Sequence, residues 1–303
     1  MITSPDAQTV GNIAGNAFVA SAGWVTIGSG TDLSDIDLTA ATLDARVRFA
    51  CDSARLYWAA DGTLQTAAAD VWPLEYDAST GKAVGRTPPE PQATNWQLEC
   101  RASNVAKTGG VGNFFSDTGT TVLTGTGPDG GDIGEVSSTA FYLYAEYNAT
   151  AAAWLVSATG SVPGAAWERI ELPFTLTAAA NVRTYNARAG STSYVYGLTA
   201  SAIPAGNAVA SFFRRLDGSS ILTGLVQVET GSYATSPVIT DTSAVTRAQA
   251  FAYVLTQNAK GMIITYSDGT SESFTFSGEY QYPLPNPSAH WGARYITKIA
   301  YQS

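Results

Sequence analysis

The chain has few charged side chains. Only 14% of its 303 residues are Asp, Glu, Lys or Arg, against about 25% in ordinary soluble domains. The 16 Lys and Arg are outnumbered by 25 Asp and Glu, which gives a net charge of −9. Binding of duplex nucleic acid needs a basic footprint that displaces counterions, so we expect no nucleic-acid partner. The same scarcity argues against a polybasic membrane anchor.

Cysteine and histidine are also scarce. Cys51 and Cys100 form neither a CxxC pair nor a metal-binding spacing, and we expect two buried free thiols, with a disulfide between them as the alternative. The single histidine, His290, stands beside Trp291 in NPSAHWG, and the sequence has no GxSxG motif. We interpret His290 as a loop residue packed on an aromatic ring rather than as a catalytic base.

Long apolar runs are missing. No run reaches 18 residues, and the longest ones, such as AAAWLV and AFAYVL, have the length of core strands. The N-terminus MITSPDAQTVGN lacks the charged and apolar regions of a signal peptide. We therefore expect no cleavable signal, no membrane insertion and synthesis in a cytosol.

What the sequence does contain is alternation of apolar and polar residues. FYLYAEY (141–147), ERIELPFTLT (168–177) and ILTGLVQVE (221–229) all alternate with period two, which predicts half-buried strands of a sandwich. Asp-Gly pairs stand between strand-like runs at Asp61-Gly62, Asp217-Gly218 and Asp268-Gly269. Each pair predicts a tight hairpin with a type I′ turn. The fold class that follows is all-β.

Two stretches suggest boundaries within the chain. RTPPEPQATN (86–95) has three prolines within six residues, which a central strand does not accommodate. GLVQVETGSYATSPVITDTSAVTR (224–247) opens as a strand and continues through Gly, Ser, Thr and Pro. The predicted segments are therefore 1–90, 91–247 and 248–303.

Several motifs resemble bacteriophage head-spike and tail-fibre proteins. The run 57–85 is similar to the N-terminal portion of that family, with matches at Tyr57, Asp61, Gly62, Leu64, Pro73, Tyr76, Asp77, Thr80 and Gly81, followed by Gly85, Glu90, Thr94 and Asn95. This chain has Arg86-Thr87-Pro88-Pro89 where the family has leucines. The stretch 224–247 resembles the end of the family's sandwich and its exit connector, at Gln227, Glu229, Gly231, Tyr233, Thr235, Ser236, Val245, Thr246 and Arg247.

Two further matches complete the resemblance. Trp167-Glu168-Arg169 resembles the Trp-x-Arg of jelly-roll carbohydrate-binding modules, and 264–299 is similar to small β-domains that close such fibres. The resemblance implies a jelly-roll-like β-sandwich (91–247) between an N-terminal virion-attachment segment (1–90) and a small C-terminal β-domain (248–303). Within the first segment, we expect Met1–Thr39 to be held by contacts with other chains of the particle.

The function implied is that of a structural virion protein. Such a protein would be a non-enzymatic short tail fibre or spike, assembled as a homotrimer with other virion proteins, that adheres to a glycan of the host surface. A head fibre or capsid decoration protein is one alternative, and a glycan-depolymerising tailspike is another. No catalytic residue and no cofactor are predicted.

Two groups of residues are candidates for binding. Glycans stack on exposed aromatic rings, and the candidates for such stacking are Trp154, Tyr144, Tyr194 and Tyr196, with burial in the core of the sandwich as the alternative. The loop GPDGGDIGE (127–135) offers Asp129, Asp132 and Glu135 to a hard cation. EF-hand spacing is absent from this loop, so we interpret it as a solvated loop rather than a calcium site.

Overall fold

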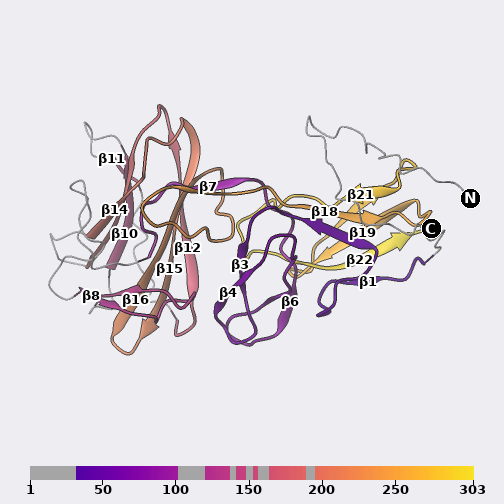
Figure 1. Ribbon diagram of the computed structural model, residues 1–303, viewed down its shortest axis with the longest axis horizontal. Coiled ribbons are helices and arrows are strands. Elements are labelled where there is room, and N and C mark those ends of the chain that lie inside the picture. Colours follow the sequence, from indigo (N-terminus) through magenta and orange to yellow (C-terminus); the bar gives the residue numbers. More distant parts are fainter. Residues whose placement is uncertain (1–31, 102–119, 137–140, 148–152, 156–163, 189–194) are drawn as a thin grey trace, which may run out of the picture. The chain divides into compact units, whose positions relative to one another are not determined.

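The computed structural model describes residues 32–101, 120–136, 141–147, 153–155, 164–188 and 195–303. All regular elements in these ranges are β-strands, and their sheets are antiparallel. The predicted all-β class is therefore confirmed (Figure 1). In the same ranges there is no helix with the length and apolar character needed to cross a bilayer.

One hydrophobic core lies between two sheets. The first sheet has the order β12 (Glu168–Leu176), β15 (Gly206–Asp217), β16 (Ser220–Thr230), β9 (Ile133–Val136) and β8 (Thr120–Leu123). The second has the order β11 (Ala153–Leu155), β10 (Phe141–Tyr147), β13 (Val182–Arg188) and β14 (Val195–Leu198). Leu172, Phe212 and Val228 of the first sheet share a buried cluster with Ala145 and Val182 of the second. The arrangement is sandwich-like, and jelly-roll connectivity stays a prediction.

The central strands β15 and β16 of the five-stranded sheet are buried on both faces over most of their length. Val209, Ser211 and Phe213 of β15 are as fully buried as the core residues that alternate with them. Phe213 packs in a second cluster with Trp58 and Trp291, which come from opposite ends of the described chain. The prediction that ILTGLVQVE (221–229) is a half-buried strand is therefore wrong, because a second layer covers the face that was expected to meet water.

A separate core is built from both ends of the described chain. One sheet has the order β1 (Ile36–Asp37), β22 (Ile296–Gln302), β19 (Gly261–Tyr266) and β20 (Ser271–Thr275), so that the indigo β1 lies beside the yellow β22 in Figure 1. A second sheet has the order β2 (Val47–Ala50), β18 (Phe251–Leu255) and β21 (Gln281–Pro283). Ile36, Val47, Val254, Ile264 and Ile299 belong to their common buried cluster.

This core corrects one expectation about the N-terminal segment. Ile36 pairs with Ile299, and Ile36 and Leu38 are completely buried within the chain's own core. The last residues of Met1–Thr39 are therefore part of this chain's own core, while residues 1–31 lie outside the described residues. Residues 33–303 form one compact unit, and the boundaries at 90 and 247 stay predictions as limits of independent domains.

The three Asp-Gly hairpins are confirmed. Asp61-Gly62 joins β3 (Arg55–Trp58) to β4 (Leu64–Ala67), Asp217-Gly218 joins β15 to β16, and Asp268-Gly269 joins β19 to β20. The type I′ geometry is wrong, because it needs two residues with positive φ and only the glycine of each pair has one. In the first and third turns the Asp carboxylate instead accepts hydrogen bonds from the backbone N–H and the hydroxyl of the threonine two residues on.

Candidate functional site

The chain crosses twice between the two cores. The two crossing segments, or passages, contain β7 (Ala93–Asn95) and β17 (Val245–Arg247) and lie side by side. β7 pairs with β17, and the hydroxyls of Thr94 and Thr246 are 2.8 Å apart. The connectors that flank these strands are not surface linkers, since residues 86–90 and 234–238 are buried. The motif residues of the two passages are therefore structural partners of one another.

A cluster of buried polar side chains surrounds these passages. We call it the joint and define it by its members: Arg55, Glu75, Thr87, Glu90, Arg169, Ser211, Gln227, Glu229, Thr235, Ser236 and Arg247. All except Arg169 are buried. They come from the first segment, from the sandwich and from the residues that follow β16 (231–247), which we call the exit connector. Because unpaired polar groups are costly in an interior, their contacts decide whether the joint stabilises the fold.

Glu90 is the centre of the first half of the joint. Its carboxylate, 1% exposed, accepts hydrogen bonds from the backbone N–H and the hydroxyl of Ser236, both at 2.6 Å. Arg247 lies at 2.9 Å and Arg55 at 3.8 Å from the same carboxylate. Burial alone would raise the pKa of Glu90, but Arg247, Arg55 and the Ser236 hydrogen bonds outweigh it and hold that pKa below its usual value.

Glu229 and Arg169 form the second half. Glu229 accepts hydrogen bonds from the Thr235 N–H and hydroxyl, each at 2.8 Å, and from the Gln227 amide at 2.5 Å. Arg169 donates to the Thr235 carbonyl at 2.5 Å and to the Ser211 hydroxyl at 2.7 Å. Burial raises the pKa of Glu229 and lowers that of Arg169. These bonds fix the exit connector against the outer face of the five-stranded sheet.

Glu75 is the remaining acid of the joint. It accepts hydrogen bonds from the Thr87 hydroxyl, from Nε1 of Trp291 at 3.3 Å and from the backbone N–H of Trp58 at 3.4 Å. The rings of Trp58 and Trp291 are stacked at 6.0 Å between centroids. No cation is among these bonding partners, and burial raises the pKa of Glu75 to about 7.

The three carboxylates of the joint are shielded from solvent. Glu75, Glu90 and Glu229 are each 2% exposed or less, so a substrate has no approach to their carboxylates. Glu90 and Glu229 were matched by the resemblance without a stated role, and Arg55 and Glu75 were not singled out. The one local feature that could have indicated the burial of Glu75 is its position within the apolar run VWPLEY (71–76).

The candidate glycan-binding residues fall on the sheet of the sandwich that has the order β11-β10-β13-β14. Trp154 lies in β11, Tyr144 in β10 and Tyr196 in β14, while Tyr194 lies outside the described residues. The backbone register places Tyr144 directly opposite Tyr185, and Tyr185 directly opposite Tyr196. Sequence reasoning missed Tyr185, because only strand pairing brings VRTYNAR (182–188) between the two predicted tyrosines.

The candidate metal ligands Asp129, Asp132 and Glu135 do not form a group suited to a metal ion. Asp129 accepts hydrogen bonds from the Arg101 guanidinium at 2.8 and 2.5 Å, and Asp132 accepts one from the Gly125 N–H at 3.2 Å. No group of three His, Cys, Asp or Glu side chains in the described ranges has an arrangement suited to a metal ion. The loop is closed by its own backbone, with the Gly127 N–H bonded to the Gly131 carbonyl.

The cysteines and the histidine add no reactive centre within the described ranges. Cys51 and Cys100 are free and buried, which confirms the prediction. Burial raises the pKa of the Cys100 thiol, which therefore stays protonated at neutral pH. His290 lies exposed in the loop before β22, so its predicted loop position is confirmed, whereas its neighbour Trp291 is the buried residue.

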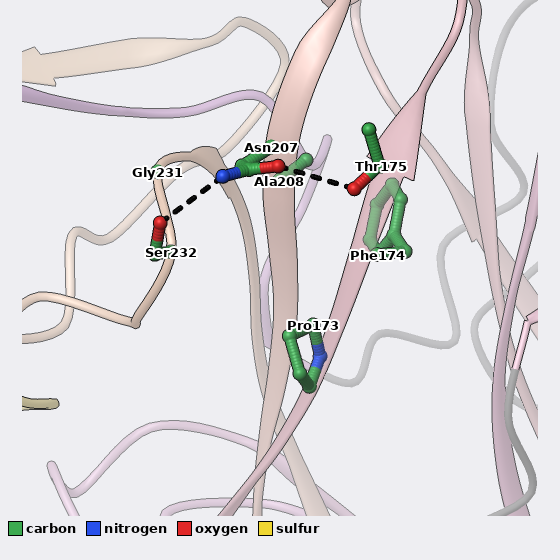
Figure 2. A pocket seen from close by; sticks show the side chains of 7 residues that line it. All are labelled: Pro173, Phe174, Thr175, Asn207, Ala208, Gly231 and Ser232. Atoms are coloured by element: carbon green, nitrogen blue, oxygen red, sulfur yellow. Dashed lines mark hydrogen bonds between the residues drawn. The ribbon is translucent and has the colours of Figure 1, made fainter.

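The surface of the described part of the chain includes the following two hollows. The first, about 250 Å³ in volume, lies between the ends of β12 and β15 and the start of the exit connector (Figure 2). There the Asn207 amide accepts a hydrogen bond from Thr175 at 3.1 Å and donates one to Ser232 at 3.2 Å. The second, about 370 Å³, is lined by Glu99, Arg101, Gly131, Asp132, Ile239, Thr240 and Asp241. Because the polar atoms of the first hollow bond to one another, it presents few groups to a ligand.

Comparison with protein-family models, curated proteins and solved structures found no match to the chain.

Proposed function

We propose that the chain is a structural virion protein of a bacteriophage, a non-enzymatic short tail fibre or spike that attaches the particle to a host-surface glycan. The observation that carries the proposal is that residues matched by the phage-fibre resemblance are also members of the joint. The residues by which the stretch 224–247 resembles phage fibres include Gln227, Glu229, Thr235, Ser236 and Arg247, and all of them are buried in the joint.

The joint suits an attachment role because it fastens two β-sheet cores at both passages of the chain. Paired strands β7 and β17 and the buried ionic contacts resist separation of those cores under load. A virion carries several copies of such a chain, so weak individual contacts with the host add up to high avidity. In the proposed assembly the copies form homotrimers and the sandwich has jelly-roll connectivity.

Competition for adsorption tests this proposal. Purified chain added to host cells should occupy the receptor and lower the rate at which particles adsorb, in proportion to the fraction of receptor bound. The same cells should release no reducing ends, because the proposed chain holds glycans and does not cut them. Unchanged adsorption at receptor-saturating concentrations would contradict the adhesion role, and release of reducing ends would favour the depolymerase alternative.

A further inference from the structure

Two buried arginines of the joint share one carboxylate. Nη1 of Arg247 lies at 2.9 Å and Nη1 of Arg55 at 3.8 Å from the same oxygen of Glu90, Oε2. Within the described residues, Glu90 is the one acid that forms an ion pair with either arginine. Glu90 is ionised at neutral pH, because its pKa is held below its usual value. Two positive charges and one negative charge therefore meet here, which leaves one positive charge in excess.

The other acids of this region have partners of their own. Glu229 and Glu171 are the acids that interact most strongly with Arg169 in the second half of the joint. Glu75 accepts its hydrogen bonds from a hydroxyl, an indole N–H and a backbone N–H. A buried charge without a partner is costly, so the excess positive charge in the first half calls for a counter-charge.

One edge of the Arg247 guanidinium finds no acceptor among the described residues. Nη1 donates to the carbonyl oxygen of Ser236 at 3.2 Å and to the hydroxyl of the same residue. Nε and Nη2 have no hydrogen-bond partner in the described part of the chain, although Arg247 is 3% exposed. The N–H bonds of these two nitrogens lie along one edge of the planar group and point in nearly the same direction. This edge is therefore a buried, preformed site with two donors.

Arg55 is weakly bonded and lies in the same neighbourhood. Its Nη2 donates to Sγ of Cys51 at 3.5 Å, and its guanidinium lies over the ring of Phe49 at 5.1 Å. Its Nε has no partner among the described residues. Sγ of Cys51 also lies 3.7 Å from the carbonyl oxygen of Ala248, the residue after Arg247. A thiol and an aromatic ring compensate a buried cation less well than an anion does.

We propose that the arginine pair (Arg55 and Arg247) binds one chloride ion, held by Nε and Nη2 of Arg247. A chloride ion accepts hydrogen bonds from both N–H groups of this edge and cancels the excess charge. A water molecule would accept the same bonds but leave the charge in place. A single-atom anion fits best among closely packed buried side chains, where phosphate or sulfate would need more room. The inference is independent of the proposed role in a virion.

The bound ion would act as a structural ligand of the joint. An ion that binds the folded chain and not the unfolded one stabilises the folded state by mass action. The folding equilibrium of the chain should therefore depend on chloride concentration and not on ionic strength alone.

Anomalous diffraction from crystals of the full chain soaked in bromide tests the site directly. Bromide replaces chloride and has a strong anomalous signal, whereas water has none. We expect an anomalous peak within hydrogen-bonding reach of Nε and Nη2 of Arg247. A peak at this position that is lost when chloride is added in excess identifies a site for halide ions.

Urea titrations in mixtures of sodium chloride and sodium gluconate test the effect in solution. The ionic strength is held constant, so that chloride concentration alone varies. We expect the folding equilibrium constant at pH 7 to rise at least about threefold between about 3 and about 300 mM chloride.

Two substitutions test the origin of this rise. Arg55→Met should abolish it, because one guanidinium then faces one carboxylate and no charge remains to be balanced. Arg247→Lys keeps the charge but removes the two-donor edge, and it should abolish the rise as well. The control is Lys298→Met, which removes a cation that is paired with Asp35 at the surface and should keep the rise unchanged. If neither arginine variant folds, the bromide peak of the wild-type chain decides the result.

Three results would overturn the inference. The first is ordinary water density, or none, at the Arg247 edge without an anomalous signal. The second is equal stability in chloride and gluconate, in which case a bromide peak would mark binding at crystal concentration only. The third is a chloride effect of the same size in wild type and Arg55→Met, which would place the ion elsewhere on the chain.

Discussion

At the residue scale, the stability of the joint depends on charges from which water is excluded. Arg247 and Arg55 are 3% and 4% exposed, and Glu90 is the carboxylate paired with both. Removal of one partner from a buried ion pair leaves the other charge uncompensated, which costs far more than the loss of an ion pair at the surface. The joint and the surface therefore provide a matched comparison.

The first prediction concerns Glu90. Glu90→Gln should lower the free energy of unfolding by about 3–5 kcal/mol, because two buried guanidinium groups lose their counter-charge. Asp35→Asn is the matched control, since Asp35 pairs with Lys298 at 3.1 Å while both side chains are about half exposed, and its effect should stay within about 1 kcal/mol. Denaturant titration at pH 7 measures both. Equal effects of the two substitutions would show that the Glu90 contacts do not hold the joint.

The second prediction concerns the pH dependence of stability through Glu75. Its pKa is about 7 in the folded chain and about 4.5 when unfolded. The folded state therefore holds the proton more tightly, and this contribution is fully present below pH 4.5 and is lost as the pH rises through 7. The loss is about 3 kcal/mol for a shift of this size.

Glu75→Gln should remove this pH dependence, because the amide stays neutral throughout. We expect the difference in unfolding free energy between wild type and variant to change by about 3 kcal/mol between pH 4.5 and pH 8, in favour of the variant at high pH. Denaturant titrations across this range measure the difference. A constant difference would mean that the folded and unfolded chains bind the Glu75 proton equally well.

At the element scale, close backbone contacts join the first segment to the final strand. β6 (Ala83–Gly85) ends beside β22, where the backbones of Arg86 and Ile296 exchange hydrogen bonds at 3.0 and 2.8 Å. Gly85 has φ +116°, and a Cβ there would overlap the carbonyl oxygen of Ile296. Only glycine meets both requirements at this contact.

The third prediction follows from this contact. Gly278 also has a positive φ, +98°, but a Cβ there would meet no atom within 4 Å. Gly278→Ala should therefore cost only backbone strain, on the order of 1–3 kcal/mol, and Gly85→Ala should cost about 1–3 kcal/mol more because of the overlap. Thermal unfolding of the two variants measures the difference. If Gly85→Ala were no more destabilising than Gly278→Ala, the close packing of β6 against β22 would be contradicted.

Local elements were predictable from the sequence, and their partners were not. The hairpins followed from Asp-Gly chemistry and the strands from alternation, because both signals lie within a few residues. Burial of β16 on both faces depends on Trp58 and Trp291, far away in the sequence. The strand also contains a bulge, where Leu225 takes φ +50° and joins the outer cluster.

The same distinction applies to the candidate sites: single residues could be predicted from the sequence, and the residues that lie beside them could not. Tyr144 and Tyr196 could be singled out as aromatic residues of alternating strands, whereas Tyr185 joins them only through the register of β13. The motif residues of the exit connector were recognised as a group, but their burial was not foreseen. Thr- and Ser-rich sequence is typical of exposed connectors, and here their hydroxyls are bonded to buried carboxylates instead.

At the scale of the whole molecule, the low density of charged side chains leaves few like charges within a contact between identical chains. With 14% charged residues, copies that pack together meet little repulsion between like side chains. The fourth prediction is therefore a homotrimer, in agreement with the phage-fibre resemblance. Light scattering of purified chain at micromolar concentration should give about three times 31.6 kDa. A mass of one chain, unchanged on raising the concentration tenfold, would contradict self-assembly in the absence of the particle.

The fifth prediction tests the central claim, that the chain is a structural component of a phage particle. Electron microscopy of purified particles that carry a gold-labelled C-terminal tag on this chain locates it directly. Label at the tail or its base, in the same positions on every particle, is the result expected for a short fibre or spike. Label spread over the capsid would move the chain to the head-fibre alternative. Mature particles free of label, with the tagged chain left behind in the lysate of infected cells, would contradict the account.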